Sequence, residues 1–536
     1  MVTIGAVTAI LLALLVTGPS LTESYRILAV FPFNGKSHDV VLDAIAQGLA
    51  KRGHQVDVVT HFPPKNPPDN YKVLVDLRGT IEETINNFTL DFARSLSGQL
   101  TDYIAGKFGN ELCELLALDG IQKIVKNPPK DPPYDLVVVH AYGANCFFGI
   151  GHVLKVPVVA VSASIEFPWM SYFIGNDDNL AYAANIYTNK YDANNFWDRM
   201  KNMYKHYNNL YKFHSLTDEP QTTAMRKYLD PNMPSIRDIE RSIALTIINR
   251  HPAIHGPKPV VSSMIEVSGL HIEDNPELPT DLKKWLDEAE DGVVYFSFGS
   301  MVLIETLPTD VLLGIYEAIS RLDHLKFLIK VADDKKLPPG LPDNVLTRPW
   351  IPQQAVLSHK NVRLFLTHTG LMSSQESIHY GVPIIGVPLF CDQWRNIRVL
   401  VERGMAIQLN YNNLTADSVY WAIEEILTNG DYKSNAVRLS KLFKDVPMKP
   451  INKAIFWIEY VIRNGPLVLR SPALDLHWWQ LAHLDMVGVA LLVIIFSLVA
   501  AYYLTKLQLM IFSHKPSKKE KPKTVKPREK KVKKVR

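Results

Sequence analysis

The sequence predicts an α/β protein with two doubly wound, Rossmann-like domains that face each other, followed by one C-terminal transmembrane helix. Ten short apolar runs rich in β-branched residues alternate with helix-length segments, the pattern of parallel sheets covered by helices on both faces. The runs fall into two sets, separated by a Pro- and Gly-punctuated stretch at 251–279. A chain of 536 residues that is 47% hydrophobic is too long for one ordinary core and too apolar to be disordered.

The N-terminus is typical of a secretory leader. Residues 4–16 form an uncharged apolar run, and small or polar residues follow it as far as Ser24. Because a signal peptide has this length, position and flank, we assign residues 1–23 to one. A buried first helix is the alternative interpretation.

Residues 24–250 form the predicted N-terminal domain and residues 280–450 the C-terminal domain, with 251–279 as the linker. The first strand, at 27–31, leads into an amphipathic helix that ends at Gly53. Ligands of doubly wound sheets bind at the carboxyl ends of the strands. We therefore expect a cleft between the two domains, formed where their strands end.

Several common functional classes lack their motifs here. No G-x-G-x-x-G follows the first strand, and there is no P-loop, no G-x-S-x-G turn and no D-x-D tripeptide for a metal-bound nucleotide sugar. The three cysteines, Cys113, Cys146 and Cys391, are too few for a disulfide-built scaffold and form no metal-ligand pair at short spacing. We expect neither a metal nor a bound cofactor.

A membrane anchor follows the second domain. Residues 451–485 are predicted to form a returning helix and a pre-membrane segment. Residues 486–504 carry no charge, and a helix of that length nearly spans the roughly 30 Å hydrocarbon layer. The tail at 505–536 is rich in lysine and should stay cytosolic, which gives a single-pass type I protein with a luminal body.

The tail also changes what the net charge of +4 means. From 513 to 536 there are twelve Lys or Arg against two Glu, a local excess of +10 that leaves the rest of the chain at −6. Lys533 and Lys534 resemble the dilysine signal by which coat machinery retrieves proteins to the endoplasmic reticulum. Asn87 and Asn413 begin glycosylation sequons, which a luminal body would expose to modification.

The densest group of polar and aromatic residues lies at 350–393. A buried strand ends at Thr367, and His368-Thr369-Gly370 turns into a helix that we expect to begin near Ser373. The free amides of a helix N-terminus suit a diphosphate, and a carboxylate one turn further, at Glu376, suits two ribose hydroxyls.

This segment resembles the signature of the UDP-glycosyltransferases, and the whole chain most resembles the insect membrane-bound members. W-I-P-Q, F-L-T-H-x-G, G-V-P-I-I-G-V-P-L-F and D-Q match in order and spacing, although Thr369 replaces the family's second glycine. The resemblance implies a GT-B fold whose N-terminal domain binds the acceptor and whose C-terminal domain binds the UDP-sugar. It assigns these roles: Trp350 stacks on uracil with Gln353 beside it, Ser300, His368 and Ser373 contact the phosphates, Glu376 binds the ribose, and Asp392 and Gln393 bind the hexose.

On the acceptor side, His38 follows the first strand and matches the family's catalytic histidine. A neutral imidazole there can take a proton from an attacking hydroxyl. The family's partner aspartate is replaced by His140 at the end of a later strand. His140 is a working substitute, or another acid such as Glu166 serves, or catalysis is weak.

The resulting hypothesis is an inverting transfer of a hexose, expected to be glucose, from a UDP-sugar to a hydroxyl of a small lipophilic acceptor. The expected partners are the UDP-sugar, the acceptor, membrane lipid and coat machinery, while homo-oligomerisation is left open. The alternative is a luminal protein of the same fold that binds UDP-sugar or lipophiles and transfers poorly. Nucleic-acid binding is disfavoured because the body is acidic and the tail has no aromatic residue after Phe512.

Overall fold

A computed structural model of the chain describes residues 24–513 and 524–530. The predicted signal peptide and the two tail lysines, Lys533 and Lys534, lie outside the described residues. The chain divides into two units, Met1–Leu474 and Asp475–Arg536. Both sheets belong to the first unit, and the second contains the C-terminal helices.

The first domain is built on a seven-stranded sheet in the order β3-β2-β1-β4-β5-β6-β7, in which all paired strands are parallel. The five strands expected here are confirmed, and two were missed. The missed strands are β3 and β7. β7 lies inside the stretch expected to be linker, and its three residues are too few to show a period. The strands are β1 Arg26–Phe31, β2 Gln55–Thr60, β3 Tyr71–Asp76, β4 Leu136–His140, β5 Val158–Ser162, β6 Leu245–Ile248 and β7 Met264–Glu266.

Helices connect and cover these strands, as parallel pairing requires. The amphipathic helix expected after the first strand is α2, and Gly53 beyond it takes the left-handed backbone (φ +102°) that favours glycine. The helices are α2 Lys36–Lys51, α3 Leu90–Ser95, α4 Leu100–Ala105, α5 Glu111–Cys113, α6 Asp119–Lys126, α7 Gly149–Leu154, α8 Pro168–Ile174, α9 Phe196–Tyr228, α10 Ile236–Glu240 and α11 Pro252–His255.

The second domain has a six-stranded parallel sheet in the order β10-β9-β8-β11-β12-β13. The five strands expected here are confirmed, and the missed strand β10 is a half-buried edge strand with a weak apolar run. The strands are β8 Val293–Ser297, β9 Lys326–Lys330, β10 Val345–Arg348, β11 Val362–Thr367, β12 Ile384–Gly386 and β13 Ala406–Gln408. The helices are α12 Thr280–Asp287, α13 Thr309–Ser320, α14 Gln353–Leu357, α15 Leu371–Tyr380, α16 Gln393–Glu402, α17 Ala416–Thr428 and α18 Gly430–Lys444.

The strand order reverses once in each sheet, between β1 and β4 and between β8 and β11. Connections on the two sides of such a point run to opposite faces of the sheet, which leaves a crevice at the carboxyl ends of the strands. Every residue expected to react or bind lies at or beyond one of these strand ends. Strand order therefore places the site.

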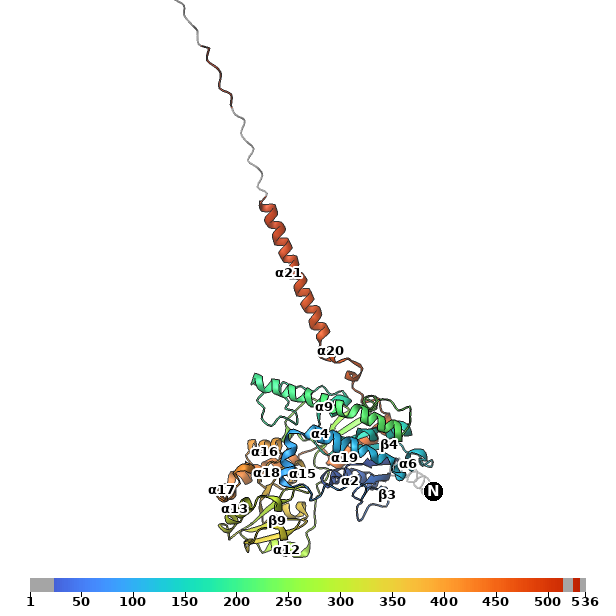
Figure 1. The fold of residues 1–536 in the computed structure, drawn as a ribbon, viewed down its shortest axis with the longest axis vertical. Coiled ribbons are helices and arrows are strands. Elements are labelled where there is room, and N and C mark those ends of the chain that lie inside the picture. Colours follow the sequence, from blue (N-terminus) through green and yellow to red (C-terminus); the bar gives the residue numbers. More distant parts are fainter. Residues whose placement is uncertain (1–23, 514–523, 531–536) are drawn as a thin grey trace, which may run out of the picture. The chain divides into compact units, whose positions relative to one another are not determined.

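The chain returns to the first domain through α19, Pro450–Asn464, which packs on α2 (Figure 1). The contact is close at Gly48, where a Cβ atom would lie 2.7 Å from the Ile451 side chain.

Cys113 and Cys146 form a disulfide in the core of the same domain. Two of the three cysteines are thus paired, which the spacing along the sequence did not show.

The second unit contains α20, Trp478–Leu481, and α21, Leu484–Ser513. By length and composition α21 is long and apolar enough to cross a membrane. It is longer than the expected span at 486–504, since the helix continues into the segment assigned to the tail. Its 30 residues correspond to about 45 Å of helix, at about 1.5 Å per residue.

Candidate active site

His38 and His140 lie together in the first domain. His38 is the third residue of α2, and His140 is the last residue of β4. Because β1 and β4 are neighbouring parallel strands, the turn after β1 meets the end of β4. His38 Nδ1 lies 3.1 Å from His140 Nε2, and the two rings meet edge to face.

Both imidazoles are held neutral. Burial lowers the pKa of His38 to about 3. Burial, and to a smaller extent the nearby His38, lower the pKa of His140 well below its ordinary value. A bond between two neutral rings needs one donor and one acceptor. When His38 Nδ1–H donates to His140, the Nε2 of His38 keeps a free lone pair, which is the form that a general base requires.

Two carboxylates lie elsewhere: Glu166, the alternative acid, and Asp135, the nearest acidic residue before His140 in the sequence. Asp135 precedes β4, at the opposite end of that strand from His140, and accepts a hydrogen bond from the Arg26 amide at 2.8 Å. Glu166 forms an ion pair with Lys258 Nζ at 2.6 Å, and the charges of Lys258 and then Arg250 overcome the effect of burial and lower its pKa to about 2. His140 is therefore the side chain that bonds to His38 in this structure.

The second domain forms one wall of a cleft of about 690 Å³. The helix after β11 begins at Leu371, two residues earlier than expected, so Ser373 is in its first turn. Gly370 precedes the helix, and the first amides of α15 are left without helical partners. Of the expected residues, the cleft is lined by Ser300, Trp350, Gln353, Ser373 and Glu376.

Hydrogen bonds connect three of the expected ligands. Gln353 Nε2 donates to Ser373 Oγ at 3.0 Å and to Glu376 Oε2 at 2.6 Å. The other carboxylate oxygen of Glu376 lies 3.1 Å from His271 Nε2, and the Tyr295 hydroxyl donates to Gln353 Oε1 at 3.2 Å. These contacts hold the side chains in place before a ligand arrives, so less side-chain conformational entropy is lost on binding.

Trp350 and Lys330 form a flat and a charged surface on the same cleft. The Trp350 side chain is 51% exposed although it lines a concavity, so its ring is free to stack on a planar base. Lys330 is the last residue of β9, and its Nζ lies 5.7 Å from the Trp350 ring centre. Burial lowers the pKa of Lys330 to about 8, so it remains largely a cation at neutral pH.

His368 lies where the two domains meet. A Cβ atom on Gly299 would approach its ring to 2.6 Å, and one on Gly370 to 2.9 Å, so both turns need glycine for this packing. Burial, and then the charge of Lys330, lower the pKa of His368 to about 3. Thr369 follows in the left-handed region (φ +63°), and its hydroxyl donates to the Gln393 carbonyl at 3.1 Å.

Gln393 is the first residue of α16, and Asp392 immediately precedes the helix, beside this turn. Asn396 Nδ2 donates to Asp392 Oδ2 at 2.8 Å, while burial raises the pKa of the Asp392 carboxyl. Gln393 Oε1 accepts from the amides of Leu389 and Phe390 and so holds the preceding turn. Within the described part of the chain the side-chain Nε2 of Gln393 has no hydrogen-bond partner, so it can still donate to a ligand.

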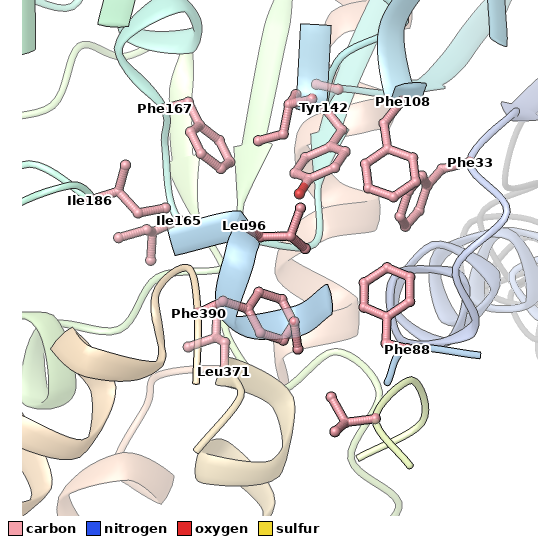
Figure 2. Packing of buried hydrophobic residues seen from close by; sticks show 14 of the residues in the cluster. Phe33, Phe88, Leu96, Phe108, Tyr142, Ile165, Phe167, Ile186, Leu371 and Phe390 are labelled. Atoms are coloured by element: carbon pink, nitrogen blue, oxygen red, sulfur yellow. The ribbon is translucent and has the colours of Figure 1, made fainter. Parts of the chain in front are cut away.

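A smaller cavity of about 120 Å³ contains His38, His368, Asp392 and Gln393. It shares Ser37, Gly299, Ser300, Met372 and Ser373 with the larger cleft, so the two cavities meet there. Its other walls are largely apolar (Figure 2), and they include Tyr142, Phe167, Ile186, Leu371 and Phe390. An apolar pocket thus adjoins the imidazole pair on one side and the polar cleft on the other.

The sequence-based predictions did not include two residues that line the cleft, Lys330 and Tyr295, or the buried His271, which lies against Glu376. Lys330 had a detectable signal, since a lysine ends an otherwise buried parallel strand, where ligands of such sheets bind. Tyr295 lies within β8 and His271 in the expected linker, and neither position distinguishes a site residue from a structural one.

The comparisons with known proteins agree with this geometry. Residues 104–521 match the family model described as UDP-glucoronosyl and UDP-glucosyl transferase. The chain belongs to the UDP-glycosyltransferase family. It is 33% identical over 89% of its length to UDP-glucosyltransferase 2 of Dactylopius coccus, covering 92% of that relative. It is 28% identical over 92% of its length to 2-hydroxyacylsphingosine 1-beta-galactosyltransferase of Rattus norvegicus, covering 90% of it.

Solved glycosyltransferases share the fold. Arabidopsis thaliana UGT89C1 matches with a TM-score of 0.55 at 16% identity, over 82% of this chain and 100% of that one. Phytolacca americana UGT2, solved with UDP-2fluoro-glucose and pterostilbene, matches with the same score, identity and coverage. The expected GT-B fold and membership of this family of glycosyltransferases are confirmed.

The buried imidazole pair predicts an unusual acid limit for this UDP-glycosyltransferase. An exposed histidine base becomes protonated near pH 6.5, but the lowered pKa of His38 keeps its ring neutral at much lower pH. We expect kcat/KM for the UDP-sugar, which reports the enzyme before the donor binds, to stay level from pH 7 down to about pH 5. A His140→Asp variant should raise the pKa of His38 and move this limit upward, because a carboxylate would then lie beside the ring.

The measurement is a pH profile of kcat/KM on solubilised enzyme, with circular dichroism at each pH to show that the protein is folded. A wild-type limit near pH 6.5 would contradict the assignment, as would identical limits in wild type and the His140→Asp variant.

Proposed function

We propose that this chain transfers a hexose from a UDP-sugar, with inversion, to a hydroxyl of a small lipophilic acceptor, and that His38 is the general base. The observation that carries the proposal is the meeting of the two cavities at Ser300 and Ser373. A UDP-sugar in the polar cleft would direct its sugar toward the apolar pocket. An acceptor in that pocket would then lie between His38 and the anomeric carbon.

In the proposed reaction, the acceptor oxygen attacks the anomeric carbon as the bond from that carbon to the diphosphate oxygen breaks. The acceptor proton passes to His38 Nε2, and UDP leaves with the bonding electron pair. The α15 amides, Ser373 and Lys330 would stabilise the diphosphate, and such preorganised electrostatic stabilisation is usually the larger contribution to rate. This proposal requires no metal ion.

Donor binding also bears on how a histidine with so low a pKa acts as a base. The negative diphosphate enters next to the imidazoles, and a nearby negative charge favours the protonated ring. We infer that the basicity of His38 rises when the UDP-sugar binds. His140 orients the ring, while the diphosphate supplies the charge that a family aspartate would otherwise give.

Glucose is the proposed sugar, and phenols, flavonoids or steroids are the proposed kind of acceptor. The support is the similarity to a UDP-glucosyltransferase and the aromatic and aliphatic wall of the smaller cavity. The test uses microsomes that contain the full chain, radiolabelled UDP-glucose, UDP-galactose or UDP-glucuronate, and a panel of these acceptors. Transfer from UDP-glucose alone supports the proposal, whereas preferred transfer from another donor, or none, contradicts it.

A second candidate function is a binding protein that retains the UDP-sugar cleft but transfers poorly. The specific observation in its favour is that no carboxylate among the described residues contacts His38 or His140. Tight UDP-sugar binding without transfer to any acceptor would favour this second candidate.

For localisation we propose a single-pass type I protein of the endoplasmic reticulum membrane with a luminal body. The apolar helix α21 supports the anchor, and the Cys113–Cys146 disulfide supports an oxidising compartment. Retrieval by Lys533 and Lys534 remains a prediction. Replacing both with serine should release the protein from the endoplasmic reticulum, and unchanged residence would contradict the retrieval role.

Glycosylation tests the luminal orientation. Asn413 is exposed, whereas Asn87 is partly buried and its Nδ2 donates to the Glu83 carbonyl at 3.0 Å. We therefore expect Asn413 to be the better glycosylated sequon. Asn413→Gln should remove a glycosidase-sensitive shift on gel electrophoresis, with Asn412→Gln as the matched control outside a sequon. A cytosolic body would show no shift in either form.

A further inference from the structure

A third cavity, of about 580 Å³, lies apart from the two described above. Its walls come from α16, from the chain between α8 and α9 and from the segment around α11. It shares no lining residue with the polar cleft or the apolar pocket. The charged residues on its wall are Arg250, Lys258, Arg395, Arg398, Arg403 and Glu402.

Arg395 is unusual among these residues. Its side chain is 9% exposed, and no described residue forms a hydrogen bond or ion pair with its guanidinium. A buried guanidinium normally finds carboxylate or carbonyl partners, because losing water without replacement costs free energy. Burial accordingly lowers the pKa of Arg395. The N–H donors of Arg395 that lack a protein partner therefore belong to a side chain on the cavity wall.

The nearby carboxylates are already engaged. Glu166 and Asp178 both bind Lys258 Nζ, at 2.6 and 2.7 Å, and Glu266 pairs with Arg250. None of these three carboxylates lines the cavity.

Two further arginines complete the charged wall. Arg398 bonds to Glu402 at 2.7 Å, and its Nη1 donates to the Asn189 carbonyl. Arg403 is exposed, and its guanidinium has no hydrogen-bond or ion-pair partner within the described ranges. Two unpartnered guanidinium groups, one buried and one at the rim, therefore border the same space.

We propose that this cavity binds a small organic oxyanion, with its carboxylate or phosphate group on Arg395. A guanidinium offers a planar pair of donors that matches both kinds of oxyanion. Apolar and aromatic residues on the wall, among them Tyr182, Tyr191, Ile254 and Val399, suit an aromatic or aliphatic body attached to that group. This inference does not depend on the proposed transferase reaction.

The test is calorimetry on the detergent-solubilised full chain in saturating UDP, which keeps the diphosphate site filled. Phenyl phosphate, benzoate and inorganic phosphate are the probes, and phenol is the uncharged control. We expect phenyl phosphate or benzoate to bind, and Arg395→Gln to weaken that binding at least tenfold. Comparison of the two organic probes distinguishes a phosphate from a carboxylate preference.

The matched control is Arg438→Gln, which removes an exposed arginine of α18 outside the cavity wall and should leave binding unchanged. Arg403→Gln changes an exposed residue and should weaken binding about threefold, so it serves if Arg395→Gln fails to fold. The proposal is overturned if no anion binds in saturating UDP. It is also overturned if folded Arg395→Gln, or Arg403→Gln in its place, binds like wild type.

Discussion

Replacing His38 with alanine is expected to lower kcat/KM by about 10² to 10⁴, because a positioned general base contributes roughly that factor. The variant should keep its affinity for UDP, since His38 lies outside the larger cleft that holds the nucleotide in the proposed complex. Steady-state kinetics with UDP-glucose and a phenolic acceptor measure the first quantity, and calorimetry with UDP measures the second.

His152→Ala is the matched control, because His152 is an exposed histidine of α7 in the same domain. Its activity should equal that of wild type. Retained transfer in His38→Ala would remove the general-base assignment. A loss of UDP binding as large as the loss of rate would indicate a structural defect instead.

Replacing Lys330 with methionine is expected to lower kcat/KM by about 10²-fold, comparable to removing one preorganised donor from an oxyanion site. Lys330 is 7% exposed on the wall of the cleft, so its charge acts where little water screens it. Methionine keeps much of the length and apolar stem while it removes the cation. The effect should appear in kcat as well as KM, because charge on the diphosphate increases as UDP leaves.

Lys326→Met is the control at the other end of β9, where Lys326 Nζ lies 3.8 Å from Glu288, outside the cleft. A control that is as impaired as Lys330→Met would show that the strand, and not the charge, is at fault. Lys330 Nζ also donates to Asn86 Oδ1 at 2.5 Å across the two domains. An Asn86→Ala variant separates loss of that contact from loss of the charge.

Much of the fold was predictable because its signals are local. Each expected strand is a short apolar run between helix-length segments, and burial on both faces of a parallel sheet requires such runs. Two of the three missed strands lack this signal, since β10 is a half-buried edge and β7 has three residues. The C-terminal apolar helix was equally visible, since its signal is an uninterrupted run of uncharged residues.

The residues of the candidate site could be predicted where they belong to a motif, because the order and spacing of the motif indicate which residues come together in the fold. Trp350, Gln353, Ser373 and Glu376 do line one cleft, and His38 does bond to His140. Lys330 ends a buried strand and so had a local signal, whereas His271 and the Cys113–Cys146 disulfide depend on approaches between distant segments. No local pattern distinguishes such residues from the rest of the chain.

The sequence by itself determined the α/β class, the two-domain order and the family, because hydrophobic period, strand spacing and motif order are properties of neighbouring residues. Only the tertiary structure decided which charged groups are paired, how far burial lowers each pKa, and where two cavities meet. Those quantities depend on desolvation and on distances between segments far apart in the chain. His38 illustrates the division: its position after the first strand predicted a base, and its burial beside His140 determined the protonation state in which that base rests.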